Sequence, residues 1–134
     1  MAEHTRDLIA AAVAARLKAY APYSKFLVGA AVRDEQGRIH AGCNVENAAY
    51  PVGACAEAGA LSAMVLAGGL RAVEVAVVGA GAGLVTPCGG CRQRLREFCA
   101  EDTKVHVCDE TGKLRRTFTL AELLPSSFGP ENLK

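Results

Sequence analysis

The stretch 73-VEVAVVGAGAGLVTPCGGC-91 decides how the rest of the chain is arranged. Val73–Val78 is a short β-branched run bounded by glycine, which predicts an interior strand, and Gly79–Gly83 predicts a flexible loop. Residues 89–100 then have helical periodicity, with the cysteine pair Cys88 and Cys91 at their start. A strand that leads through a glycine-rich loop into a helix is typical of layered α/β proteins.

The flanking sequence continues this alternation of helices and strands. Apolar residues recur at helical spacing from Glu3 to Tyr20, and Ala21-Pro22 ends that pattern. Phe26–Arg33 and Arg38–Cys43 flank turn residues and predict a hairpin. The remaining expected elements are a helix over 54–67, the helix over 89–100 with Arg96 facing outward, strands over 104–108 and 114–119, and a helical turn over 120–124. Together they predict an α/β layered domain with a sheet at its centre.

Composition and charge limit the partners of the chain. Its 134 residues, 51% of them hydrophobic, are enough for one domain with its own core. A net charge of +1, from 15 basic and 14 acidic residues, creates no long-range field for a nucleic acid or an anionic membrane. Charged residues occupy the N-terminal segment where a signal peptide needs an apolar run, and Glu57 and Glu74 interrupt the longest apolar stretches. We therefore expect a soluble, cytoplasmic protein with a small-molecule partner, no nucleic acid and no membrane.

The spacing of Cys88 and Cys91 allows three interpretations. A C-x-x-C pair at a helix N-terminus can be a redox pair, because the helix dipole lowers thiol pKa values. It can be half of a metal site, because positions three apart in a first helical turn direct their sulfurs toward one point. Two buried cysteines brought together by chance are the least expected case.

Cys55 offers the third ligand that a metal site needs, at the start of the other buried helix. Both helix N-termini would then face one metal ion and stabilise the thiolates. Three cysteines without an obvious fourth protein ligand leave one coordination position open, which is the layout of a catalytic zinc site.

Glu57 lies two residues after Cys55, among Ala54, Ala56 and Ala58. A glutamate on a helix is solvated surface by default. Here its small apolar neighbours form no polar face, so we interpret Glu57 as the group that transfers protons beside the metal.

The motifs 55-CAE-57 and 86-TPCGGCRQ-93 together resemble the cytidine deaminase family of zinc nucleoside deaminases. Cysteine stands at position 55 where the related pattern has histidine, as in the small tetrameric branch of the family. The resemblance extends from about Tyr20 to the tail 123-LLPSSFGPENL-133. It implies a three-layer α-β-α domain over residues 1–134, with a central mixed sheet of about five strands.

The resemblance also implies a reaction and a role for each matching residue. The reaction is hydrolytic deamination of cytidine and 2'-deoxycytidine to uridine and 2'-deoxyuridine, with release of ammonia, in pyrimidine salvage. The implied zinc ligands are Cys55, Cys88 and Cys91, with one Zn²⁺ per subunit, and the implied proton shuttle is Glu57. The implied substrate contacts are the aromatic Phe26, the ribose-binding Asn44 and Glu46, and the main chain at Ala56, Thr86 and Pro87. Ala48, Tyr50 and Phe128 match residues that reach a neighbouring subunit's site, which implies a homotetramer with shared active sites.

Position 58 departs from the family pattern. In many cysteine-ligated members an arginine follows the catalytic glutamate, but here Ala58 does. Three thiolates on Zn²⁺ leave a formal charge of −1, and Arg92, directly after Cys91, is the nearest candidate in the sequence to offset it.

Other functions remain open from sequence. Deamination of a modified cytosine antibiotic, of free cytosine or of cytosine in a polynucleotide would use the same zinc motif. The charge balance and the lack of a basic, aromatic strand-binding stretch disfavour a polynucleotide. A structural zinc or redox module without catalysis is the alternative outside the enzymes, and Glu57 argues against it.

Overall fold

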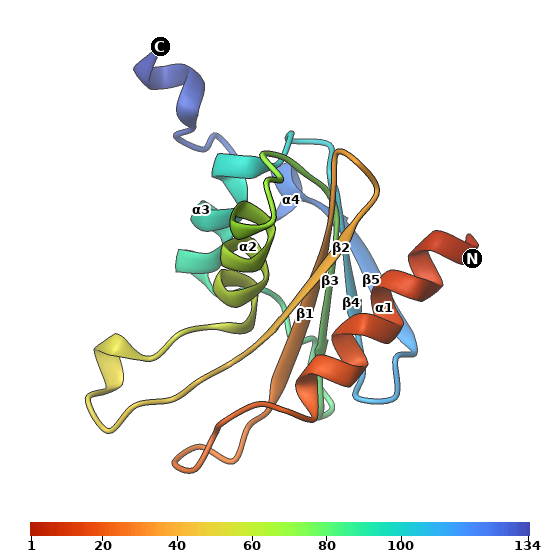
Figure 1. The fold of residues 1–134 in the computed structure, drawn as a ribbon, viewed down its shortest axis with the longest axis vertical. Coiled ribbons are helices and arrows are strands. Elements are labelled where there is room, and N and C mark those ends of the chain that lie inside the picture. The colour runs from red at the N-terminus through yellow and green to blue at the C-terminus, as the bar shows by residue number, and fades with distance from the viewer.

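The computed structural model describes residues 1–134, and its centre is a mixed sheet of five strands in the order β2-β1-β3-β4-β5 (Figure 1). The strands are β1 Val28–Asp34, β2 Ile39–Cys43, β3 Ala72–Gly79, β4 Lys104–Cys108 and β5 Leu114–Thr119. Only β3 and β4 run parallel, and every other neighbouring pair is antiparallel. β3 is nearly all buried, as its β-branched sequence predicts.

Helices cover both faces of the sheet and complete three layers (Figure 1). α1 (Glu3–Arg16) packs on one face through Leu8, Ile9 and Ala12. α2 (Ala56–Leu66) and α3 (Gly89–Phe98) pack side by side on the other face, where the larger core cluster lies, and the short α4 (Leu120–Leu123) joins them. The expected three-layer α-β-α architecture with a five-stranded mixed sheet is confirmed.

Two glycines let helices approach the sheet closely. A Cβ at Gly29 on β1 would overlap the carbonyl oxygen of Ala12 in α1. A Cβ at Gly42 on β2 would overlap the main chain of α2 at Ala56 and Ala60. The second contact matters for the site, because it fixes the height of the first turn of α2 above the sheet.

The predicted first helix is too long at its C-terminal end. The helix ends at Arg16, where the Arg16 side chain donates to the carbonyl of Leu27, and the backbone N–H of Tyr20 donates instead to the carbonyl of Asn44. Leu17 and Tyr20 are exposed. The chain therefore leaves the helix to pair with the loop after β2, a contact between segments distant in sequence.

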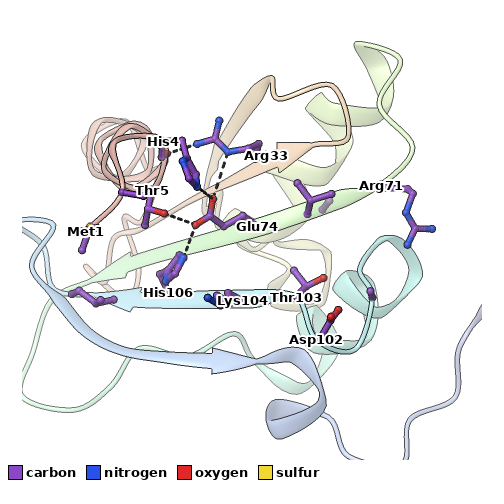
Figure 2. A pocket seen from close by; sticks show the side chains of 15 residues that line it. Met1, His4, Thr5, Arg33, Arg71, Glu74, Asp102, Thr103, Lys104 and His106 are labelled. Carbon is purple, nitrogen blue, oxygen red and sulfur yellow. Dashed lines mark hydrogen bonds and ion pairs between the residues drawn. The ribbon is translucent and has the colours of Figure 1, made fainter.

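A buried polar cluster links α1 to strands β3 and β4 (Figure 2). The carboxylate of Glu74 on β3 accepts a 2.7 Å hydrogen bond from the Thr5 hydroxyl of α1 and lies 2.7 Å from Nε2 of His106 on β4. Arg33 of β1 pairs with the other carboxylate oxygen at 3.5 Å. These partners satisfy the carboxylate of Glu74. The polar cluster that lines the surface hollow in Figure 2 is therefore explained by the docking of α1 on the sheet. None of the helices is both long enough and apolar enough to cross a membrane.

Candidate active site

Three cysteine sulfurs meet where the N-termini of α2 and α3 converge. Cys55 is the N-cap residue of α2, Cys88 is the N-cap residue of α3, and Cys91 lies in the first turn of α3. The three sulfurs lie within 4.8 Å of one another, and those of Cys55 and Cys88 are 3.9 Å apart. Zinc–sulfur bonds of about 2.3 Å in a tetrahedron separate two sulfurs by about 3.8 Å, so this donor set fits zinc.

Burial of the thiols opposes their ionisation, and a bound cation would offset that effect. Desolvation raises the pKa of Cys91 and, at the half-buried N-cap, of Cys55. The backbone N–H of Cys91 acts the other way on Cys88 and lowers its pKa. A divalent cation bound by thiolates compensates the desolvation that opposes ionisation of the buried pair. All six cysteines of the chain are free thiols.

Glu57 lies buried in the first turn of α2, with 4% of its surface exposed. Burial raises the pKa of its carboxyl, and its own backbone N–H, the Cys91 thiol and the charge of Arg94 oppose that rise. A carboxyl group with a raised pKa holds its proton at a higher pH than a solvated glutamate does, which suits a group that accepts and releases protons. Its hydrogen bond with the Cys91 thiol places the carboxyl beside one of the three sulfurs.

A hollow of about 450 Å³ opens beside Cys55, lined mainly by residues of the loop after β2. It brings together Asn44, Glu46, Tyr50 and Cys55 with residues 23 and 24 of the loop before β1. A hollow of this size at a site with a few polar groups is typical of small-molecule binding.

The side chains of Asn44 and Glu46 hold these two loops together. Asn44 accepts from the backbone N–H of Val28 at 2.9 Å and donates to the carbonyl of Phe26 at 2.9 Å. Glu46 accepts from the backbone N–H groups of Tyr23 and Ser24 and from the Ser24 hydroxyl. Hydrogen bonding to Ser24 lowers the pKa of Glu46, so its carboxylate stays charged at the rim.

The remaining predicted contacts come from several segments of the chain, and of these only Tyr50 lines the 450 Å³ hollow. Phe26 is half-exposed on the loop before β1, and Ala56 begins α2. Thr86 and Pro87 lead into Cys88. Ala48, Tyr50 and Phe128 are exposed, on segments that extend from the body of the molecule (Figure 1).

The two arginines after the cysteine pair do different things. Arg92 donates to the carbonyls of Pro87 and Leu123 and to the Thr86 hydroxyl, so it fixes the segment before α3 and makes no hydrogen bond to sulfur. Arg94 donates from Nη1 to the sulfur of Cys91 at 3.5 Å. The geometry therefore favours Arg94 over the predicted Arg92 as the cation beside the ligands.

Sequence reasoning missed two polar side chains at the site, Arg94 and Ser24, and was wrong about a third, Arg96. Arg94 could have been found, because it follows Cys91 by three positions on a helix. Ser24, the partner of Glu46, carries no local signal. Arg96 was expected to face outward but is only 6% exposed, because it binds Ser127 and Glu131 of the tail. Nothing near Arg96 in the sequence indicates that it bonds to Ser127 and Glu131 of the tail.

Known proteins match the chain along most of its length. Residues 2–107 match the family model described as cytidine and deoxycytidylate deaminase zinc-binding region. A cytidine deaminase of Sporosarcina psychrophila is 45% identical over 126 residues, which are 94% of this chain and 92% of that protein.

Solved structures agree. The crystal structure of cytidine deaminase from Burkholderia pseudomallei is 43% identical, with a TM-score of 0.86 over 96% of this chain and all of that one. The structure of cytidine deaminase from Mycobacterium tuberculosis is 38% identical, with a TM-score of 0.79 over 93% of this chain and 97% of that one. With its cysteine cluster and buried glutamate in this fold, the chain belongs to the cytidine and deoxycytidylate deaminase family, and its cofactor is zinc.

Proposed function

We propose that this protein is a zinc-dependent cytidine deaminase, which converts cytidine and 2'-deoxycytidine to uridine and 2'-deoxyuridine with release of ammonia. The observation that carries the proposal is Glu57, a buried carboxyl group beside three sulfurs that fit one zinc ion. A structural zinc or redox module has no use for that carboxyl group. Family membership and the names of the relatives support the same activity.

The proposed site divides the work between the metal and the chain. Cys55, Cys88 and Cys91 hold the zinc ion, which when bound supplies the Lewis acidity that makes water a nucleophile near neutral pH. Glu57 carries one proton from the attacking water to N3 of cytosine and a second to the departing amine at C4, so that ammonia leaves and a carbonyl remains. The N-termini of α2 and α3 favour the thiolate charges by their dipoles.

The hollow beside Cys55 supports a nucleoside substrate in preference to a free base. Asn44 and Glu46 line it, and in this proposal the hydrogen-bonding capacity that they do not use on the neighbouring loop binds a ribose hydroxyl. A site built around a hydroxyl group rejects analogues that lack it, because its own polar groups are then left unpaired. Phe26 and the main chain of Ala56, Thr86 and Pro87 are the proposed contacts of the base. A net charge of +1 offers no attraction for a polynucleotide.

We propose further that the working enzyme is a homotetramer with shared active sites. Tyr50 is 75% exposed and Phe128 is 58% exposed, large apolar surfaces on extended segments that a second copy would cover. With Ala48 they would complete a neighbour's site. Each subunit is expected to be one domain over residues 1–134 and to act in pyrimidine salvage. Six free thiols suit a reducing compartment, which supports a cytoplasmic location.

One experiment tests the activity and the role of Glu57 together. Bound zinc is measured by elemental analysis, and the loss of cytidine, deoxycytidine and cytosine absorbance is followed for the wild type, Glu57→Gln and Glu110→Gln. Glu110 is an exposed glutamate in the turn before β5 and serves as the matched control. We expect zinc in all three proteins, turnover of both nucleosides by the wild type and Glu110→Gln, and a loss of about 10²–10⁴-fold in Glu57→Gln.

Each failure in this experiment has its own meaning. A zinc-loaded wild type that leaves both nucleosides unchanged contradicts the proposed function. Faster turnover of free cytosine than of cytidine contradicts the assignment of Asn44 and Glu46. A fully active Glu57→Gln contradicts the proton-transfer role but leaves the substrate assignment standing.

A further inference from the structure

The proposed zinc site has a charge problem that its own ligands create. Three thiolates bound to Zn²⁺ carry a formal charge of −1, and the carboxylate of Glu57 lies in the same buried place when ionised. Negative charge that is removed from water is costly unless a cation or hydrogen-bond donors accompany it. The dipoles of two helix N-termini supply only part of that compensation, about half an elementary charge each.

The guanidinium of Arg92 binds main-chain and hydroxyl oxygens and no ligand sulfur. Its guanidinium donates at 2.7–3.1 Å to three oxygens, those of Pro87, Leu123 and the Thr86 hydroxyl. These bonds use Nε and both Nη atoms, so that the fork faces α4 and the loop before α3. Arg92 therefore shapes the main chain next to Cys88 without contacting a sulfur.

Arg94 is the cationic side chain that contacts a ligand sulfur. Long side chains on a helix lean toward its N-terminus, so a residue at position i reaches the turn that contains i−3. Arg94 follows this rule, and its Nη1 donates to Cys91 Sγ at 3.5 Å. A Cβ at Gly90 would lie only 3.2 Å from the same Nη1. Glycine at position 90 therefore leaves room for the guanidinium beside Cys91.

Arg94 shares a surface hollow with Ala58. The two residues line it together with Leu61 of α2 and Phe98 of α3. The small side chain of Ala58 leaves room in this hollow, and Arg94 lines it from the facing helix α3. Position 58 on α2, where many cysteine-ligated relatives carry an arginine, therefore lies close to Arg94 on α3.

We propose that Arg94 is the charge-compensating residue of the zinc site, a positioning residue that stabilises the Cys91 thiolate from α3 in the absence of an arginine at position 58. This inference rests on the proposed zinc site and names a residue that the cysteine and glutamate motif does not include. Because Arg94 is exposed, its effect on the thiolate is partly screened by solvent and falls with ionic strength.

Zinc affinity provides the test, independent of turnover. Zinc dissociation constants are measured by competition with a chromogenic chelator for the wild type, Arg94→Gln and Arg94→Lys, at low and high NaCl. Loss of a charge-assisted hydrogen bond predicts a dissociation constant about tenfold higher for Arg94→Gln at low salt. Arg94→Lys keeps the charge and should stay within about threefold of the wild type, and added salt should weaken zinc binding more in the wild type than in Arg94→Gln.

Two further variants make the result specific. Arg6→Gln removes an exposed arginine from α1, on the other face of the sheet, and should leave zinc affinity unchanged. Ala58→Arg combined with Arg94→Gln returns a cation to the same hollow from α2 and should recover most of the lost affinity. Thermal unfolding of the zinc-free proteins, with equal midpoints expected, shows that folding is intact.

The proposal is overturned if Arg94→Gln binds zinc within twofold of the wild type, or if Arg94→Lys loses as much affinity as Arg94→Gln. Failure of the proposed function is distinguishable from these results, because a wild type that binds no zinc or leaves cytidine unchanged shows it before any variant is compared.

Discussion

At the scale of single residues, two neighbouring arginines of α3 bind different partners: Arg94 donates to the sulfur of Cys91, whereas Arg92 donates to the carbonyl of Leu123. Cys88 and Cys91 are predicted from their spacing at the start of a helix, where local geometry fixes the direction of a side chain, and Cys55 is predicted from its place at the start of the other buried helix. The burial of Glu57 follows equally from its apolar neighbours. The choice between Arg92 and Arg94 depends on where the carbonyl of Leu123 lies, and that position is set by the fold of a distant segment.

Asn44 ties the loop after β2 to the segment before β1, and this structural role can be tested separately from substrate binding. Replacing it by alanine removes two 2.9 Å hydrogen bonds that tie the loop after β2 to Phe26 and Val28. We expect Asn44→Ala to lower the free energy of unfolding by about 1–3 kcal/mol and to raise KM for cytidine at least tenfold. Asn47→Ala is the matched control, because Asn47 bonds only the backbone N–H of Ala49 within its own turn. Chemical denaturation and steady-state kinetics measure the two effects separately. Equal free energies of unfolding for the two variants would refute the structural role, and equal KM values would refute the role in binding.

At the scale of elements, strands were predicted more accurately than helix ends. β4 and β5 have the predicted bounds, because their alternation and turns are local signals. The end of α1 and the burial of Arg96 were wrong, because partners far along the chain decide both. α2 and α3 begin close to the predicted residues, which is why the ligands were found.

The glycines under α1 and α2 separate fold stability from site geometry. Gly42→Ala forces α2 away from β2 at the turn that carries Glu57, and Gly29→Ala forces α1 away from β1 on the opposite face. Each overlap with main chain should lower the free energy of unfolding by about 1–3 kcal/mol. Only Gly42→Ala should also weaken zinc binding and lower kcat. Denaturant unfolding with zinc titration of both variants measures this, and equal effects on zinc affinity would contradict it.

Asp34 at the β1–β2 turn makes the hairpin sensitive to acid. Burial alone would raise its pKa, but hydrogen bonds from His40 and from the backbone and side chain of Arg38, with one from Gln36, lower it well below its usual range. A carboxyl whose folded pKa is depressed stabilises the fold above its unfolded pKa of about 4, and this contribution is lost as pH falls below that value. We expect Asp34→Asn to unfold several degrees below the wild type at neutral pH.

The difference between the two proteins should shrink as the pH falls below about 4, where Asp34 begins to be protonated in the unfolded chain. Thermal unfolding at several pH values measures it, and loss of zinc in acid affects both proteins alike. A difference that stays constant from pH 7 to pH 3 would show that the charge of Asp34 is not what stabilises the turn.

At the scale of the whole molecule, the structure leaves large apolar side chains on segments that extend from the body. The loop that carries Tyr50 and the tail that carries Phe128 leave the body as separate projections (Figure 1). Arg96 and Gln93 of α3 hold the tail by side-chain hydrogen bonds to Ser127, Glu131 and the Phe128 carbonyl. A tail that is held in place with its aromatic ring exposed suits insertion into another copy of the chain.

Mixed assemblies test whether active sites are shared between subunits. Glu57→Gln lacks its own proton shuttle but keeps Phe128, and Phe128→Ala lacks the tail ring but keeps Glu57. We expect each pure protein to have low activity. A co-expressed equal mixture should recover about a quarter of wild-type activity per subunit, because half of the sites keep Glu57 and half of those receive an intact Phe128 from a neighbour. If Phe128 serves only its own subunit, the mixture shows no more than the mean of the two pure proteins, and the shared site is refuted.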